Sequence, residues 1–311
     1  MPLQVEVKGV TRMWASGHLR HSFDGIGLVW LSQEVKPKED LVMLRDFNNL
    51  EGKSKTARGA KVVLEVPETS EVNDYRARLH EYNSFLVRHC VALAVNDDQL
   101  STIAQRMQGK DESDVTKALN LSSVQLRRMF SRGSMQKGGR FFGGWWQGVP
   151  SLYRPHIIID GYQTVEIDYS SMALRIIYAR RGHQVPEDVD LYDIGLDNWE
   201  GPLDKRRKPI KTYINAILND ESGRYRLTKD ELEILGVTQK ILHQKLLERH
   251  EAISDLFNTG IGMDTQFIES NIASLVISKM LYEGILGQQH RLTLKDHGGE
   301  VTLVKRHQRR T

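Results

Sequence analysis

The sequence predicts a fold of the α+β class. Three observations support this prediction. Strand-like patterns dominate residues 1–70, an apolar stripe at helical spacing follows over Val72–Val95, and the second half of the chain mixes short strands with longer helices. With 311 residues, of which 40% are hydrophobic and 27% charged, the chain can bury a real core. We therefore expect one large domain or two ordinary ones.

The first part of the chain, residues 1–136, is interpreted as an accessory domain. Strands are predicted near the alternating valines at 5–10, in the apolar run 26–31 and at 61–66, and the lysine-rich stretch 33–58 is predicted to be loop. A long amphipathic helix is expected over Val72–Val95, with an apolar stripe formed by Tyr75, Leu79, Tyr82, Leu86 and Val91. Two shorter helices are predicted over residues 98–107 and 113–130, the second with a break at 120–122.

The second part, residues 137–311, follows a glycine-rich and aromatic segment that begins at Gly133 and ends at Pro150. Asp160-Gly161 then separates two short apolar-rich runs, and both residues tolerate the positive φ of a tight turn, so a β-hairpin is predicted over 156–168. Helices are predicted over residues 208–218 with Pro209 in the first turn, 228–235, 238–257 and 264–286, and a last hairpin over 291–306.

Charge and cysteine content limit the function classes. The formal net charge is +3, which permits a nucleic-acid partner through a local basic groove without demanding one. Cys90 is the only cysteine, which excludes a disulfide within the chain and a cysteine-based zinc site. Residues 1–12 do not resemble a signal peptide, and no apolar run approaches the roughly 18 residues of a membrane span. We expect a cytoplasmic protein without a membrane partner.

Asp168 lies where a predicted strand changes into a helix. A carboxylate at such a point is rigidly held and opens to a cleft, so it suits binding of Mg²⁺. Phosphoryl transfer to a 3′-hydroxyl commonly uses two such ions, held by two or more carboxylates. The alternative is a plain structural role, in which Asp168 caps the helix that follows.

Short sequence segments around Asp168 resemble known motifs. The run Glu166–Arg175 resembles the first catalytic motif of family A DNA polymerases, Asp-Tyr-Ser-x-x-Glu-Leu-Arg. Upstream, Gly139-Arg140 and Gln147–Pro150 resemble that family's Gly-Arg and Gln-Asn-Ile-Pro words, in the same order. The aromatic cluster at 141–146 resembles compact relatives carried by phages and mobile elements. The resemblance covers about residues 138–286 and implies a palm with helical fingers, preceded by an N-terminal α/β accessory or reduced-thumb domain.

A basic stripe supplies candidate nucleotide-binding residues. Arg207 and Lys211 lie one helical turn apart, on a stripe that Asn215 and Asn219 continue. The spacing resembles the family's second motif, in which an Arg and a Lys hold the triphosphate. A solvated charged face is the alternative.

Two more positions follow from the resemblance. Asp190-Leu191-Tyr192 resembles the Asp-x-His word at the start of the fingers, so Tyr192 is a candidate phosphate donor, with a helix-entry or turn role as the alternative. Where the family has a Glu that blocks the ribose 2′-hydroxyl, this chain has Ala173, which implies ribonucleotide tolerance.

Four polar side chains are candidates for nucleic-acid binding. The resemblance implies that Arg140 and Gln147 face the primer–template. It also implies that the helix 264–286 offers Gln266 and Ser270 to the template. The same helix can instead serve as an amphipathic core element, with Leu275 among its packed residues.

The family's last motif, His-Asp followed by Glu or Ser, has no direct counterpart. Asp296, at the expected tip of the last hairpin, is the candidate second metal carboxylate, and Glu300 is the next. The alternative is a diverged C-terminal end in which residues 305–310 form a basic tail.

The favoured function is template-directed, Mg²⁺- or Mn²⁺-dependent nucleotidyl transfer with nucleoside triphosphates and a primer–template. A degenerate polymerase that binds nucleic acid without catalysis is the alternative. Two further alternatives are an unrelated interaction domain and a nuclease.

Overall fold

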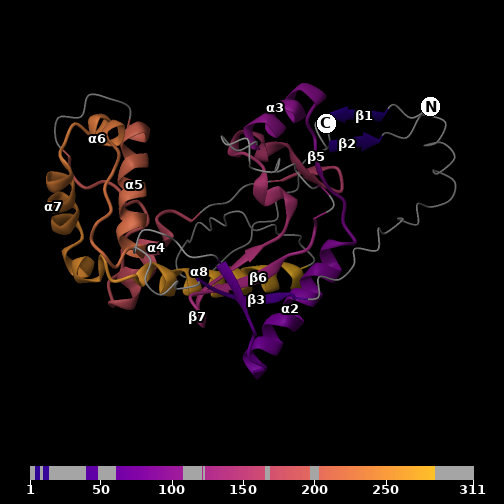
Figure 1. Ribbon diagram of the computed structural model, residues 1–311, viewed down its shortest axis with the longest axis horizontal. Coiled ribbons are helices and arrows are strands. Elements are labelled where there is room, and N and C mark those ends of the chain that lie inside the picture. Colours follow the sequence, from indigo (N-terminus) through magenta and orange to yellow (C-terminus); the bar gives the residue numbers. More distant parts are fainter. Residues whose placement is uncertain are drawn as a thin grey trace.

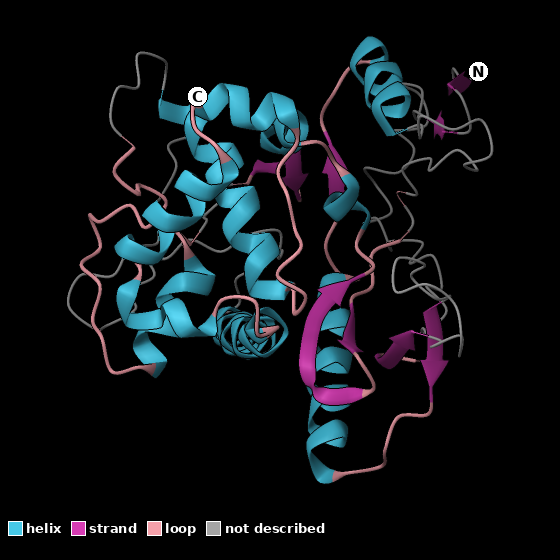
Figure 2. Ribbon diagram, turned by 60° about the vertical axis from the view of Figure 1, so that its left-hand side comes forward, coloured by secondary structure: helices cyan, strands magenta, loops and turns pink. Residues whose placement is uncertain are grey.

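The computed structural model describes residues 4–7, 10–13, 40–47, 61–107, 121, 123–164, 169–196 and 203–283. Within these residues, three small β-sheets and a larger set of helices confirm the predicted α+β class in general. The strands gather toward one end of the molecule and most helices toward the other, with α8 (Ile261–Tyr282) running between them (Figure 1). In the turned view of Figure 2, the larger strands and most of the helices again lie on opposite sides.

The central sheet has four strands in the order β4-β3-β6-β7. They are β4 (Lys61–Leu64), β3 (Val42–Phe47), β6 (Arg127–Ser131) and β7 (Ser134–Phe142), and only the β3–β6 pair is parallel. β4 confirms the strand predicted at 61–66. The loop predicted over 33–58 is wrong at residues 42–47, because β3 pairs on both edges and buries Val42 and Leu44.

Two helix predictions overextended into strands. α2 (Ser70–Leu86) begins after Thr69, whose hydroxyl accepts the Val72 amide, but it ends at Leu86 and the chain enters β5 (Val91–Leu93). The helix predicted over 113–130 is wrong at its end, where β6 stands. Burial alternates with period two along β6, the pattern of a strand. α3 (Asp97–Met107) confirms the helix predicted over 98–107.

The remaining strands form two small sheets. β1 (Gln4–Val7) and β2 (Val10–Met13) pair antiparallel, which confirms strands near the first valines. β5 pairs with β8 (Ile157–Ile159), and β8 with β9 (Tyr162–Gln163). The β8–β9 hairpin turns at Asp160 and Gly161, which have φ of +51° and +84°, as the Asp-Gly pair predicts. Two short 3₁₀ helices, η1 (Trp145–Gly148) and η2 (Ser151–His156), precede β8.

The helical group contains α4 (Met172–Arg180), α5 (Leu203–Asn219), α6 (Lys229–Leu235), α7 (Gln239–Arg249) and η3 (Glu251–Leu256). α6 confirms its prediction and starts with a capping box between Thr228 and Glu231. The helix predicted over 238–257 breaks at His250. Pro209 lies inside α5 and not in its first turn, because the helix starts at Leu203.

Two buried clusters make up the core. The sheet-side cluster packs α2, β3, β6 and η1 against the second half of α8, whereas the helical cluster packs α4 to α7. The boundary expected between residues 136 and 137 falls within β7, and the sheet-side cluster contains residues from both sides of it. On α8 the buried residues include Ser270 and Ala273, whereas Leu275 is 62% exposed, so the face predicted to pack inside is wrong at that residue.

Among the described residues, no helix combines the length and the apolar character that a membrane crossing requires.

Candidate nucleotide-binding site

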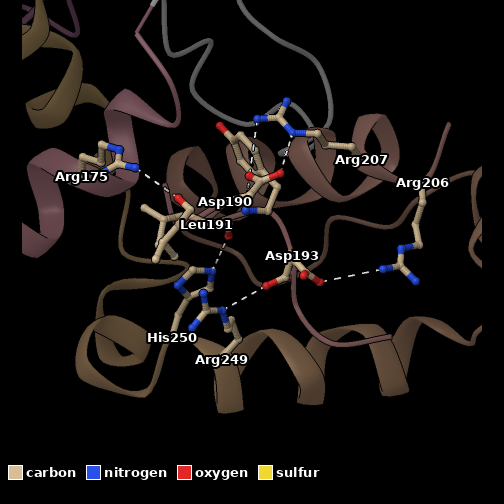
Figure 3. Close-up of polar contacts among 10 residues, drawn as sticks. Arg175, Asp190, Leu191, Asp193, Arg206, Arg207, Arg249 and His250 are labelled. Atoms are coloured by element: carbon tan, nitrogen blue, oxygen red, sulfur yellow. Dashed lines mark hydrogen bonds and ion pairs between the residues drawn. The ribbon is translucent and has the colours of Figure 1, made fainter. Parts of the chain in front are cut away.

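The turn at residues 189–193 is fixed from several helices. The buried imidazole of His250 donates from Nε2 to the carbonyl oxygen of Leu191 at 3.0 Å, and Arg249 Nε donates to the carbonyl of Asp193 at 3.0 Å. Arg206 of α5 lies 3.8 Å from an Asp193 carboxylate oxygen. Figure 3 shows these side chains converging on the turn from different directions. The turn is therefore a rigid part of the helical group.

Arg175 of α4 fixes the approach to this turn. Its guanidinium donates to the Ser170 carbonyl at 3.1 Å and to a row of carbonyl oxygens of Val185, Pro186, Glu187 and Val189. This arginine ends the motif-like run 166–175, but the sequence assigned it no role. Its contacts show a structural one: a single planar group with five N–H donors organises several exposed and half-buried carbonyls.

Asp190 and Tyr192 surround Arg207. Arg207 Nε donates to Asp190 Oδ2 at 2.9 Å, and its Nη2 lies 3.5 Å from Oδ1. The guanidinium carbon stands 4.7 Å from the centroid of the Tyr192 ring, a cation–π distance. Burial alone would raise the pKa of Asp190, but the hydrogen bonds from Arg207 and from the Tyr192 amide hold that pKa below its usual value. Asp190 is therefore an anion fixed beside Arg207.

Lys211 joins the same group one turn along α5. Its Nζ lies 5.8 Å from the centroid of the Tyr192 ring, so two cations lie within cation–π distance of one aromatic ring. The structure thus brings together Arg207, Lys211 and Tyr192, three of the residues that sequence reasoning selected for nucleotide binding.

The rest of the stripe turns toward α8. Asn219 donates to the backbone carbonyl of Asn215 at 2.8 Å and accepts a long hydrogen bond, 3.4 Å, from Gln266. The stripe on α5 therefore leads from the two cations to Gln266, one of the four residues predicted to meet nucleic acid.

The start of α4 holds Ala173 and an unusual serine. Ala173 is half-buried against the helical cluster. Ser171 has a φ of +51° and is only 5% exposed, and its hydroxyl has no hydrogen-bond partner within the described parts of the chain. A serine in the left-handed region with a buried hydroxyl is strained, and such strain is common at functional sites.

The other residues predicted to contact nucleic acid make contacts within the protein. Arg140 on β7 pairs with Glu269 of α8 at 2.7 Å, with 48% of the arginine side chain exposed. Gln147 bridges the Gly143 amide and the Phe141 carbonyl, both at 3.0 Å, so it holds β7 to η1. Ser270 is buried and donates to the Phe267 carbonyl. Arg140 and Gln266 keep exposed surface, whereas Ser270 serves the packing of α8.

Sequence reasoning missed Arg128 on β6. This arginine is 1% exposed, donates to the Gly139 carbonyl and to Ser270 and Asn271 of α8, and stacks on Tyr75 of α2 at 4.2 Å. Burial lowers the pKa of its guanidinium. No local pattern signals it, because its partners lie on three other elements, β7, α8 and α2.

The predicted metal carboxylates, Asp168, Asp296 and Glu300, lie outside the described residues. Within the described part, no three histidine, cysteine, aspartate or glutamate side chains gather as a metal site would require. The chain matches no protein-family model, no curated protein and no solved structure at a significant level.

Proposed function

We propose that this protein is a template-directed nucleotidyltransferase of the DNA polymerase type, in which the α4–α7 group acts as the fingers. The observation that carries the proposal is the pairing of Arg207 and Lys211, one turn apart on α5 and above one aromatic ring. Two cations at this spacing suit the phosphates of a nucleoside triphosphate, because each can neutralise a different group. The motif-like run that ends at Arg175 supports the same assignment.

Each group of residues has a separate role in the proposed reaction. Arg207 and Lys211 bind the triphosphate and stabilise the charge that develops on the leaving diphosphate. Arg140 and Gln266, near the β7–α8 contact, bind the primer–template. Asp168, with Asp296 or Glu300, would hold Mg²⁺ or Mn²⁺, which stabilises the attacking and leaving oxygens when bound.

Ala173 concerns how the site discriminates between ribo- and deoxyribonucleotides. A small side chain at this position leaves room for a ribose 2′-hydroxyl, so we propose weak discrimination between ribo- and deoxyribonucleotides. Incorporation of the two measured separately under matched conditions tests this part, and a strong preference for deoxyribonucleotides would contradict it.

Primer extension on DNA and RNA templates with Mg²⁺ or Mn²⁺ tests the proposal. We expect extension by the wild-type protein, none by Asp168→Ala, and a loss of about 100-fold in kcat/KM for Arg207→Ala, the scale of losing a group that stabilises transferring phosphates. Lys208→Ala is the matched control, because this exposed lysine is the next residue on α5.

The outcomes separate the candidate functions. Primer–template binding without extension would replace the proposal with a binding protein that lacks catalysis. Absent or salt-insensitive nucleic-acid binding would contradict both functions, because phosphate contacts make affinity fall steeply with salt.

A further inference from the structure

Tyr192 contacts the two cations through its ring. The residue is only 5% exposed, so its hydroxyl has little surface to offer a ligand. The ring centroid lies 4.7 Å from the guanidinium carbon of Arg207 and 5.8 Å from Nζ of Lys211. A negative ring face attracts cations, and the attraction grows when the ring is removed from water.

The ring stands on a backbone that cannot easily move. The Tyr192 amide donates to Asp190 Oδ1 at 3.0 Å, and the carbonyls on both sides of this residue are held by His250 and Arg249 (Figure 3). The backbone that carries the ring is thus held from the end of α7 and the start of η3, and through Asp190, which also binds Arg207.

Arg207 is held on one edge and one face. Asp190 contacts the Nε edge and Tyr192 the ring face, whereas Nη1 at the outer end donates to no other residue in the described parts of the chain. The outer end of a guanidinium offers two parallel N–H donors that match an oxyanion. The arrangement therefore leaves available the edge that would bind a phosphate.

We propose that Tyr192 and Asp190 are positioning residues that orient Arg207 and Lys211 toward a polyphosphate, and that Tyr192 acts through its ring and not its hydroxyl. This inference rests on the proposed function and deepens it. Asp190 reduces the net positive charge of the site, but it removes the rotational freedom of a long side chain before the ligand arrives.

Binding of inorganic tripolyphosphate, measured by calorimetry at fixed salt, tests the inference without requiring catalysis. We expect Tyr192→Phe to bind within about twofold of wild type, because the ring remains. Tyr192→Leu should bind about 3- to 30-fold more weakly, the range of a cation–π contact. Asp190→Asn keeps the shape and the acceptor for the Tyr192 amide, and we expect its affinity for tripolyphosphate to fall by about 1.5- to 5-fold.

A double-mutant cycle separates positioning from a general packing role, since a buried ring also stabilises the fold. If the ring acts through the cations, Tyr192→Leu costs less affinity in an Arg207→Ala background than in the wild-type protein, because one of the two cations near the ring is gone. Equal losses in Tyr192→Phe and Tyr192→Leu would assign the role to the hydroxyl and overturn the inference. So would a gain of affinity in Asp190→Asn, or independent losses in the cycle.

Failure of the proposed function has a different signature. If wild-type protein binds no tripolyphosphate, or if Arg207→Ala binds it as well as wild type does, the function and the inference both fail. If wild-type binding depends on Arg207 but not on the Tyr192 ring, only the inference fails.

Discussion

The sheet-side cluster and the helical cluster bury polar groups in opposite ways. The sheet side buries a cation: Arg128 lies among neutral acceptors and aromatic faces, with Tyr75, Phe130 and Phe141 within 5.6 Å of its guanidinium carbon. The helical side buries the imidazole of His250 and half-buries that of His243, and each imidazole is joined to a tyrosine. His250 pairs with Tyr178, and His243 with Tyr213, both at 2.9 Å.

This difference determines how each region responds to its surroundings. A guanidinium stays charged at all ordinary pH values, so the sheet side depends on keeping every acceptor around Arg128. An imidazole in an apolar site stays neutral, and burial lowers the pKa of both histidines. The helical side, which carries the candidate nucleotide site, is therefore the region that acid should affect first.

Replacing Arg128 should have the largest effect. Arg128→Met keeps much of the volume but leaves Ser270, Asn271 and the Gly139 carbonyl without their donor. We expect a loss of about 4 kcal/mol in the free energy of unfolding, because several charge-assisted hydrogen bonds are broken in a buried site. Urea denaturation measures the loss, and amide hydrogen exchange should place it in β6, β7 and the second half of α8.

The matched control for this change is Arg88→Met, an exposed arginine just after α2, which should change stability by less than about 0.5 kcal/mol. A loss below about 1 kcal/mol in Arg128→Met would show that the buried cation is not what holds the sheet side together.

The same contrast explains which parts of the fold can be predicted from sequence. The β8–β9 hairpin and α6 follow from short local signals, Asp160-Gly161 and the Thr228–Glu231 capping box. β3 was missed because its parallel pairing with β6 joins residues far apart in the chain, whereas β6 also pairs with the next strand, β7, through a turn at Arg132 and Gly133, which have φ of +55° and +62°. Local spacing cannot reveal a parallel pair of this kind.

The candidate site shows the same limit. Arg207 and Lys211 were found because residues one turn apart share a helix face. The sequence did not reveal that Asp190 pairs with Arg207, or that the Tyr192 ring lies near both cations. These contacts depend on how the turn at 189–193 packs on α5. Sequence spacing carries no information about that packing.

Acid should destabilise the helical side next. Burial lowers the pKa of His250 to about 4, whereas in the unfolded chain it titrates near 6.5. The native histidine stays neutral while the unfolded one takes up a proton, so stability is complete above pH 6.5 and falls toward pH 4. The loss from this residue reaches about 3 kcal/mol at pH 4. Urea denaturation at a series of pH values measures it.

Two variants isolate this contribution. His250→Asn should lower stability at neutral pH but flatten the fall between pH 6.5 and 4, whereas His80→Gln, at an exposed position on α2, should leave the curve unchanged. If the His250→Asn curve fell as steeply as that of wild type, other groups would account for the acid response.

The smallest expected effect concerns the contact between the two regions, where α5 ends against the start of α8. Gly262 is buried, and a β-carbon there would lie 2.5 Å from Asn219 Oδ1, the atom that accepts from Gln266. Gly262→Ala should cost about 1 kcal/mol, because the clash exceeds the gain in helix propensity.

In an Asn219→Ala background the obstacle is gone and only the propensity gain remains, so the same substitution should become neutral or stabilising. Thermal denaturation of the four proteins in this cycle measures the change of sign. An equal loss in both backgrounds would mean that the glycine is required by the backbone of α8 itself. The expected reversal would instead show that Asn219 requires the glycine, and that this contact joins the α5 stripe to the helix shared by both clusters.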